Sequence, residues 1–309
     1  MRTARHRVFW LAAVFFALAL GLVAGSGVFT GATLPGPGGP DAALQQRVAG
    51  LEAQNKSLSE KLLAADQFDA RMSGRIVRDI LDGTSVVLFR TPDAQDSDVD
   101  AVARLVGRAG GKVTGTIGLS REFVGGDSAQ KLGSVVDSPI VPAGTRLNTA
   151  LTDPAARAGD LAGSGLLINR DPRIAPMGGA ARATVLGALR DAGLLTYDSA
   201  GAADTAVVVT GGALPDGAGS QGVTVARFAA ALAPHGSGVV LAGREGSSTG
   251  AAAVAVTRGD AALDATLSTV DDIGSEAGRI TAVLALQNMV AGGQPGRYGV
   301  GAGAAVTVQ

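Results

Sequence analysis

The chain has no cysteine and only two histidines among its 309 residues. Without cysteine there is no disulfide framework, so an exported domain of this sequence must be stabilised by its core. The same absence removes the softest protein ligand for copper, zinc or iron–sulfur clusters. The remaining soft ligands are scattered along the chain: His6, His235, Met1, Met72, Met177 and Met289. No two of them share a motif, so the sequence leaves any metal-binding residues unknown.

Net charge and aromatic residues are also scarce. The formal net charge is −1, so no basic field is present to attract nucleic acid, and we expect no nucleic-acid partner. Eight Phe, two Tyr and one Trp stand against 46 Gly. In a chain this rich in glycine, short glycine motifs arise by chance and need support from their context.

One long stretch contains no charge. Residues 8–28 read VFWLAAVFFALALGLVAGSGV, and about 20 apolar residues match the hydrocarbon thickness of a membrane. Arg2, Arg5 and Arg7 precede this run, and the next basic residue is Arg47, which predicts a cytoplasmic N-terminus and an extracytoplasmic remainder. We therefore expect a transmembrane anchor. The alternative is a signal peptide cleaved near Ala24, but the run exceeds the usual apolar length of such peptides.

A spacer and a heptad repeat follow the anchor. Residues 34–40 read LPGPGGP, whose prolines interrupt any helix. Asp41 is a plausible N-cap of a new helix. Residues then recur with 4,3 spacing, which is typical of the a and d positions of a coiled coil. The predicted interface consists of Leu44, Val48, Leu51, Asn55, Leu58 and Leu62.

The residues that flank this seam favour parallel pairing of two chains. Arg47 at g would face Glu52 at e of a second chain, and Lys61 at g would face Asp66 at e. Asn55 is the one polar a residue, a device that fixes register and favours dimers. We therefore expect a homo-oligomer. The alternative is an amphipathic helix that packs on its own domain.

The rest of the chain alternates strands and helices. We expect strands at 85–89, 112–119, 205–210, 238–242 and 253–257, with an extended segment at 194–197. Helices are expected at 96–106, 182–192, 224–232 and 280–290. This alternation predicts an α/β fold with a Rossmann-like, largely parallel sheet and helices on both faces.

Five parts are therefore predicted. They are a basic head and anchor (1–33), a Pro/Gly spacer (34–40), a coiled-coil helix ended by Gly83 (41–82), an extracytoplasmic α/β domain (83–292) and a loose Gly-rich tail (293–309).

Local motifs give no persuasive active site. Gly217, Gly219 and Gly222 form a G-x-G-x-x-G with Glu245 after the next expected strand, but seven residues separate Gly217 from Thr210, too long for a dinucleotide turn. His235 follows Pro234 at a helix end, where it would interact with the helix dipole. Asp271 and Asp272 read as a solvated turn. We expect no catalytic residues, no bound cofactor and no enzyme activity.

Four long strings carry a resemblance. They are SGRIVRDILDGTSVVLFRTPDA (73–94), VVVTGGAL (207–214), VTVARFAAALAPHGSG (223–238), and STVDDI with GRITAVLAL within 268–286. With the order of the parts, they make the chain resemble the actinobacterial MctB copper-transport family over nearly its full length.

The resemblance implies copper efflux and homeostasis through an outer-envelope pore of mycolic-acid bacteria. Some relatives also look like cell-separation factors that act on cell-wall hydrolases, so the second hypothesis is a coiled-coil envelope scaffold with such a partner. A single helical anchor suits the inner membrane, and a pore would need several chains. The family supplies no copper-ligand motif. We therefore expect the domain from about Gly83 onward to bind Cu(I) weakly or not at all.

Overall fold

The computed structural model describes residues 40–125, 128–138, 145 and 147–305. The predicted anchor, with Arg2, Arg5 and Arg7, lies outside the described residues, as do residues 34–39 of the spacer. None of the helices within the described ranges has the length and apolarity needed to cross a membrane. The chain divides into two compact units, Met1–Glu60 and Lys61–Gln309.

The second unit is built on one seven-stranded sheet with the strand order β3-β2-β1-β4-β5-β6-β7. All neighbouring strands are parallel except β2 and β3. The strands are β1 (Ser85–Arg90), β2 (Lys112–Leu119), β3 (Leu195–Thr196), β4 (Thr205–Val209), β5 (Val239–Ala242), β6 (Ser268–Val270) and β7 (Arg297–Tyr298). Counting only the parallel strands along the chain, the order is 2-1-3-4-5-6, a doubly wound order whose direction of winding reverses between β1 and β4.

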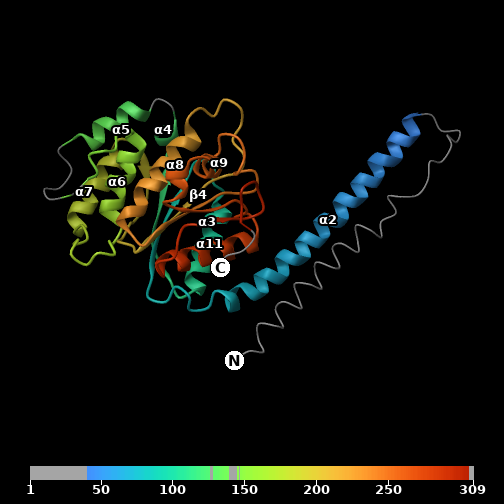
Figure 1. Cartoon of the computed structure of the whole chain (residues 1–309), viewed down its shortest axis with the longest axis horizontal. Coiled ribbons are helices and arrows are strands. Elements are labelled where there is room, and N and C mark those ends of the chain that lie inside the picture. The colour runs from blue at the N-terminus through green and yellow to red at the C-terminus, as the bar shows by residue number, and fades with distance from the viewer. Residues whose placement is uncertain (1–39, 126–127, 139–144, 146, 306–309) are drawn as a thin grey trace. The chain divides into compact units, whose positions relative to one another are not determined.

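Helices cover both faces of this sheet, as predicted (Figure 1). On β1, Val87 and Phe89 belong to one buried cluster, whereas Val86 and Leu88 belong to the other. This alternation follows from the two-residue period of a strand, and burial on both faces explains the continuous apolar runs. The first face carries α4 (Arg121–Val124), α5 (Ser128–Val136), α6 (Pro154–Leu166), α7 (Gly179–Asp191), α8 (Gln221–Leu232) and α9 (Ala253–Gly259), and the second carries α3 (Asp96–Arg108) and α11 (Glu276–Val290).

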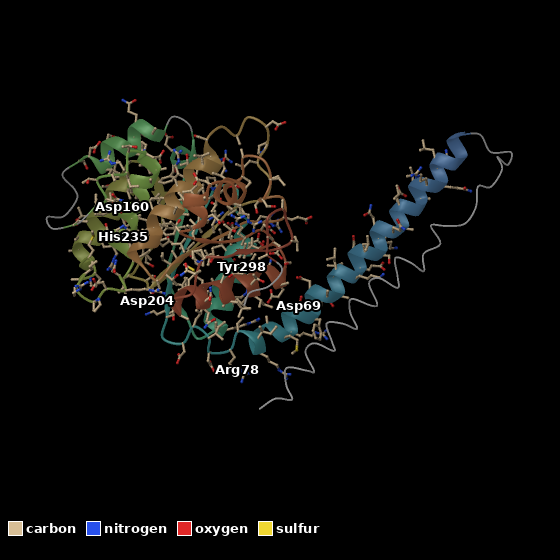
Figure 2. All side chains as sticks on the ribbon, viewed as in Figure 1. Asp69, Arg78, Asp160, Asp204, His235 and Tyr298 are labelled. Carbon is tan, nitrogen blue, oxygen red and sulfur yellow. The ribbon has the colours of Figure 1, made fainter. Side chains whose placement is uncertain are left out.

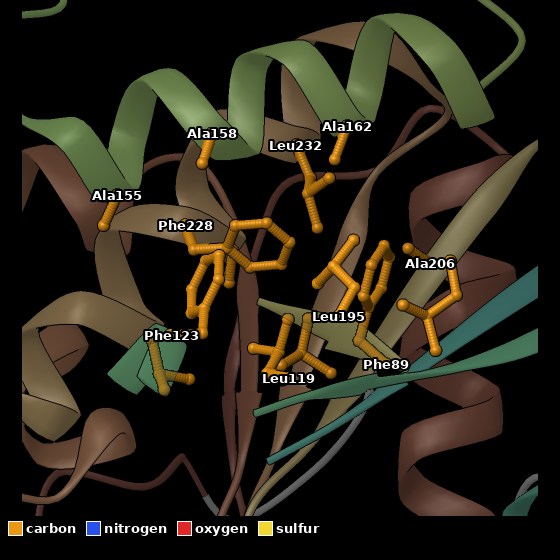
Figure 3. Close-up of a cluster of buried hydrophobic side chains, with 14 of the residues drawn as sticks. Phe89, Leu119, Phe123, Ala155, Ala158, Ala162, Leu195, Ala206, Phe228 and Leu232 are labelled. Atoms are coloured by element: carbon orange, nitrogen blue, oxygen red, sulfur yellow. The ribbon is translucent and has the colours of Figure 1, made fainter. Parts of the chain in front are cut away.

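The first cluster contains most of the aromatic packing (Figure 3). The Phe228 ring of α8 makes edge contacts with Phe89 and Phe123, at centroid distances of 5.3 and 5.1 Å. Around these rings α6 contributes small residues, including Ala155, Ala158 and Ala162. Because its packing face is made of small side chains, α6 can approach α8 closely.

The long helix α2 spans Pro40–Ile76. It therefore ends earlier than the predicted boundary at residue 82, and turns lead from Val77 to Gly83. Val77 and Leu81 in these turns are fully buried in the second cluster. Gly83 has φ +71°, a left-handed conformation that glycine adopts without strain, as expected of the residue that separates the helical segment from β1.

Three local expectations are wrong. Residues 253–257 belong to helix α9, because the edge beside β5 is taken by β6 and the Ala-rich segment packs on α8. Asp271 is not in a solvated turn: it is 1% exposed at the end of β6. Finally, the segment expected to be a loose tail contains β7, which pairs with β6.

Candidate functional site

In doubly wound sheets, ligands bind beyond the carboxyl ends of the strands, where the strand order reverses. Here that position lies between the loops after β1 and β4. The chain places its own carboxylate there, because Asp93 follows β1 and reaches across to the β4 loop. Its Oδ2 accepts a hydrogen bond from the Gly211 N–H at 3.1 Å. Its Oδ1 accepts from the Thr91 hydroxyl at 2.6 Å and from Gln221 Nε2, in the first turn of α8, at 3.1 Å.

Gly211 has to be glycine for this contact to form. A Cβ at Gly211 would lie 2.5 Å from Asp93 Oδ2 and 2.8 Å from the Asp93 carbonyl oxygen. The position where a ligand's anionic group would be bound in such folds is therefore filled by Asp93.

The G-x-G-x-x-G motif does not form a phosphate loop. Gly217 and Gly219 adopt φ +88° and +62° in the long loop between β4 and α8. Gly222 lies within α8, where a Cβ would come 1.8 Å from the Ala251 carbonyl oxygen, so this glycine allows close packing. Glu245 is exposed at the end of β5. The long spacing between Thr210 and Gly217 is consistent with this geometry.

The neighbouring strand ends are closed by buried ion pairs. Asp98 of α3 is buried and contacts Arg279 Nη2 at 3.0 Å and Arg244 Nε at 3.1 Å. Asp271 pairs with Arg258 and accepts hydrogen bonds from the backbone N–H groups of Val300 and Gly301. These charges join the loops after β5 and β6 to α3, α9 and the end of the chain, and their mutual pairing gives them a structural role.

A different pair of polar residues lies on the first face of the sheet. His235, in the 3-10 turn Ala233–His235 after α8, places Nε2 2.7 Å from Asp160 Oδ1 of α6 (Figure 2). The other oxygen, Asp160 Oδ2, accepts from the Asn148 N–H at 2.7 Å. The side chains of His235 and Asp160 are only 16% and 7% exposed. The interaction expected of His235 from the sequence was with the helix dipole, and the structure gives it a carboxylate partner.

Two glycines of α6 make room for this pair. A Cβ at Gly159 would lie 2.4 Å from the Phe228 carbonyl oxygen, and one at Gly163 would lie 2.7 Å from His235 Cδ2. The Cδ2–Nε2 edge of the imidazole therefore faces α6. The opposite edge, which carries Nδ1, faces away from α6.

His235 borders two hollows of the surface. The first, of about 610 Å³, is also lined by Asn148, Asp153, Asp160 and Arg227. Asp153 both caps α6, accepting from the Ala156 N–H at 3.0 Å, and pairs with Arg227 at 2.6 Å. The second, of about 860 Å³, is lined by His235 with Met177, Asn169 and Asp171.

Most polar groups of the second hollow already have partners. Asp171 binds Arg173 through both oxygens, and the Arg173 guanidinium holds the pKa of that carboxyl below its ordinary value. Asn169 donates to the Pro234 carbonyl at 3.2 Å. His235 and Met177 are the residues with soft ligand atoms in this lining, and the Met177 sulfur packs toward α6, where a Cβ at Gly165 would lie 3.8 Å from it.

Sequence reasoning did not find Asp160 or α6. The available signal was Asp153 followed by Pro154, an N-cap with proline at the first helical position. Asp160 is also the only charged residue in the Gly- and Ala-rich second half of that helix. A lone acid in such a helix needs a buried partner, but nothing in the sequence identifies His235 as that partner.

The model of the family described as "Copper transport outer membrane protein, MctB" matches residues 1–308. This chain belongs to the MctB family. It is 54% identical over 312 residues to a copper transporter MctB of Mycobacterium tuberculosis, covering 100% of this chain and 99% of that protein. A copper transporter MctB of Mycobacterium leprae is 54% identical over 310 residues, covering 98% of each chain.

The match to the MctB family extends over every predicted part of the chain, including the anchor and the stalk. The described residues contain no cluster of three or more His, Cys, Asp or Glu side chains arranged to hold a metal ion. Membership therefore rests on similarity along the whole sequence.

Proposed function

We propose that this chain acts in copper transport and copper homeostasis at the cell envelope, without enzyme activity of its own. The observation that carries the proposal is end-to-end similarity to proteins named copper transporter, at 54% identity over 100% of the chain. A relative that shared only the α/β domain would support only the fold. Here the similarity runs through the predicted head and stalk as well as the domain, so it supports a shared function of the whole chain.

The direct test is copper tolerance. A strain that lacks the gene should grow more poorly in copper, and the full chain should restore growth. The stalk alone and the domain alone should each fail, because the proposal requires both parts. A deletion strain that tolerates copper as well as its parent contradicts the proposal. Fractionation with protease accessibility on intact cells tests whether residues beyond the anchor lie outside the cytoplasm.

Self-association through α2 forms part of the proposal. The predicted seam carries large apolar side chains that are exposed in the single chain: Leu44 by 63%, Val48 by 47%, Leu51 by 55%, Leu58 by 57% and Leu62 by 71%. Asn55 in the same seam is also exposed. A second copy fits this face, because the heptad pattern and the Arg47–Glu52 charges are complementary under parallel pairing, whereas the predicted Lys61–Asp66 pair falls where Asp66 contacts the chain's own domain.

The base of α2 limits how far this pairing can extend. Asp66, Asp69 and Ser73 follow Leu62 at helical spacings of 4, 7 and 11, so all four residues share one face. Asp66 Oδ1 accepts the Glu276 N–H at the start of α11, at 2.7 Å, and Ser73 is fully buried beside Arg108. From Asp66 onward the seam face is thus used by the chain's own domain, and the proposed pairing ends near Leu62.

The second candidate function is an envelope scaffold that acts on cell-wall hydrolases during cell separation. The exposed seam favours it, because a coiled-coil stalk can present its domain to a partner protein without transporting any ion. The two candidates separate in vivo. If disruption of the seam abolishes cell separation and spares copper tolerance, the scaffold is supported, and the reverse result supports copper transport through an assembly of several chains.

A further inference from the structure

The end of α2 and the end of α3 meet at the surface of the domain. Ser73 is fully buried there and accepts a hydrogen bond from Arg108 Nη1 at 3.3 Å. A Cβ at Gly74 would lie 3.9 Å from Arg108 Cδ, so the Arg108 side chain extends along α2 beside Gly74. The Leu81 N–H donates to the Ala109 carbonyl at 2.8 Å, which holds the two segments together.

This junction brings basic side chains together. Arg71 and Arg78 stand three residues before and four residues after Gly74, spacings that place them on the same side of the helical segment as Gly74. They therefore flank the place where Arg108 crosses α2, and Figure 2 shows Arg78 at the base of this helix. Two neighbouring arginines extend the group. The basic cluster consists of Arg71, Arg75, Arg78, Arg104 and Arg108, all of them exposed.

The basic cluster lacks the counter-charges that other arginines of this chain have. Nine arginines of the described residues form ion pairs with Asp or Glu, and none of these nine belongs to the cluster. The spacing within the cluster also disfavours its helices, because Arg71 and Arg75, like Arg104 and Arg108, are like charges four residues apart. The stability of the fold therefore does not explain why five cations are gathered here.

Helix dipoles account for only part of this charge. The carboxyl ends of α2 and α3 each carry about half a negative charge. Asp79, Asp82 and Asp100 are the exposed acids close to the cluster in sequence. With Lys112 at the start of β2 included, the basic residues still exceed all these negative charges by about two. The excess is local, since the whole chain has a net charge of −1, and it favours an anionic partner at this junction.

We propose that the basic cluster binds a flexible polymer that carries phosphate groups. The cluster consists of arginines, whose planar forks bind phosphate through two parallel N–H···O bonds. Phosphate oxygens accept from several directions, so one phosphate can bridge guanidinium groups from two helices, whereas a carboxylate accepts mainly in its own plane.

The position along α2 favours a polymer over a membrane. Roughly 30 residues of α2, about 45 Å at 1.5 Å per residue, separate Arg71 from the spacer that follows the predicted anchor. A polymer of the envelope is therefore closer to the cluster than are the head groups of the membrane that the anchor would span. This location in the envelope rests on the proposed function, whereas binding of the polymer is tested on the purified protein.

Fluorescence anisotropy of end-labelled inorganic polyphosphate tests the contact on the full chain in detergent. Five arginine–phosphate contacts should give a slope of about −3.5 for log K against log salt concentration, as for single-stranded polyanions. The double variant Arg71→Gln, Arg78→Gln removes two contacts, so the slope should become less steep by about 1.4 and binding at 0.15 M salt should weaken about 10-fold. Absence of binding, or an unchanged slope in this variant, overturns the proposal.

The matched control is Lys56→Gln with Arg121→Gln, which removes two exposed cations outside the cluster. It should leave the slope unchanged, and equal weakening by the two double variants would overturn the cluster as the site. Poly-L-glutamate of the same length should bind more weakly, and equal binding would overturn the assignment to phosphate.

Nanodiscs distinguish a polymer from lipid as the source of phosphate. The full chain should bind polyphosphate equally well in discs of phosphatidylcholine and of phosphatidylglycerol. Loss of binding in the phosphatidylglycerol discs would assign the cluster to lipid head groups and overturn the polymer. Copper tolerance of the deletion strain is measured separately, so failure of polyphosphate binding would refute this contact and leave the copper function standing.

Discussion

At the scale of single residues, the surroundings of Asp272 disfavour the charged form of its carboxyl group. Burial, and then the neighbouring Asp271, raise its pKa above the ordinary value for aspartate. The folded protein therefore binds this proton more tightly than the unfolded chain does. Above the ordinary carboxyl range, keeping Asp272 charged costs stability, and the cost disappears as the pH falls below that range.

We expect Asp272→Asn to raise the melting temperature at pH 7 and to lose this advantage in acid, as the native Asp272 becomes protonated. Thermal unfolding of both proteins between pH 3 and pH 7 measures the difference. A stabilisation that grows toward low pH would contradict the assigned direction of the pKa shift.

Gly159 is a second residue whose replacement has a defined consequence. Its missing side chain lets Phe228 approach, because a Cβ would lie 2.4 Å from a backbone oxygen that cannot move independently of α8. We expect Gly159→Ala to destabilise the protein by about 1–3 kcal/mol, the usual cost of overpacking. Denaturant unfolding measures this free energy.

The matched control is Gly187→Ala in α7, where a Cβ would meet nothing within 4 Å. It should stabilise the protein by about 0.5–1 kcal/mol through helix propensity. A destabilisation of the same size at both positions would show that the contact between α6 and α8 is not responsible.

The sequence predicted few of these residue-level features. Asp98 and Asp160 are buried acids whose partners, Arg279 and His235, lie far along the chain, and the buried Asp271 pairs with Arg258 of another element. Composition and spacing identify charged residues but do not reveal which distant loops meet. Only the fold brings such residues together, so the polar contacts of the candidate site had to come from the structure.

At the scale of elements, the seam of α2 supports the sharpest test of association. Burying Val48, Leu51, Leu58 and Leu62 should contribute about 1.5–3 kcal/mol per side chain. The double variant Leu51→Asp, Leu58→Asp should therefore be monomeric in analytical ultracentrifugation of the chain from residue 41 onward. Asn55→Ile should raise dimer stability and relax the preference for two chains, since a polar a residue costs stability and fixes register.

Leu63→Asp is the control for this series. Leu63 is 62% exposed but lies off the seam, so the charge should leave the mass unchanged. A wild-type fragment that stays monomeric at high concentration rules out the parallel dimer. Unfolding of the double variant without a change of mass would instead favour the helix packed on its own domain.

Elements with strong local signals were predictable. The strands β1, β4 and β5 are apolar runs rich in valine, and they are the buried centre of the sheet. The segment at 253–257 also contains valines, alternating with alanines, but it forms α9. Its tertiary packing on α8 overrides the preference of such a short pattern for a strand. β6 and β7 have three and two residues, too few for periodicity to show.

At the scale of the whole molecule, the N-terminus of the mature protein tests the predicted anchor. Because the apolar run is longer than that of a signal peptide and follows three arginines, we expect the mature chain to begin at its own N-terminus. Intact-mass measurement of protein purified from membranes provides the answer. A mature chain that begins between residues 24 and 32 would show cleavage and remove the anchor from the proposed topology.

The carboxylate of Asp93 also affects whether the domain can bind anions from solution. An anion tethered a few ångströms from its donors acts as if present at a very high local concentration, commonly in the millimolar range or above. Phosphates and nucleotides dissolved outside the protein would have to outcompete that tethered group for the Gly211 N–H and the Gln221 amide. At this edge of the sheet, where doubly wound folds bind ligands, the donors are already occupied by Asp93. Free anions therefore bind there only weakly.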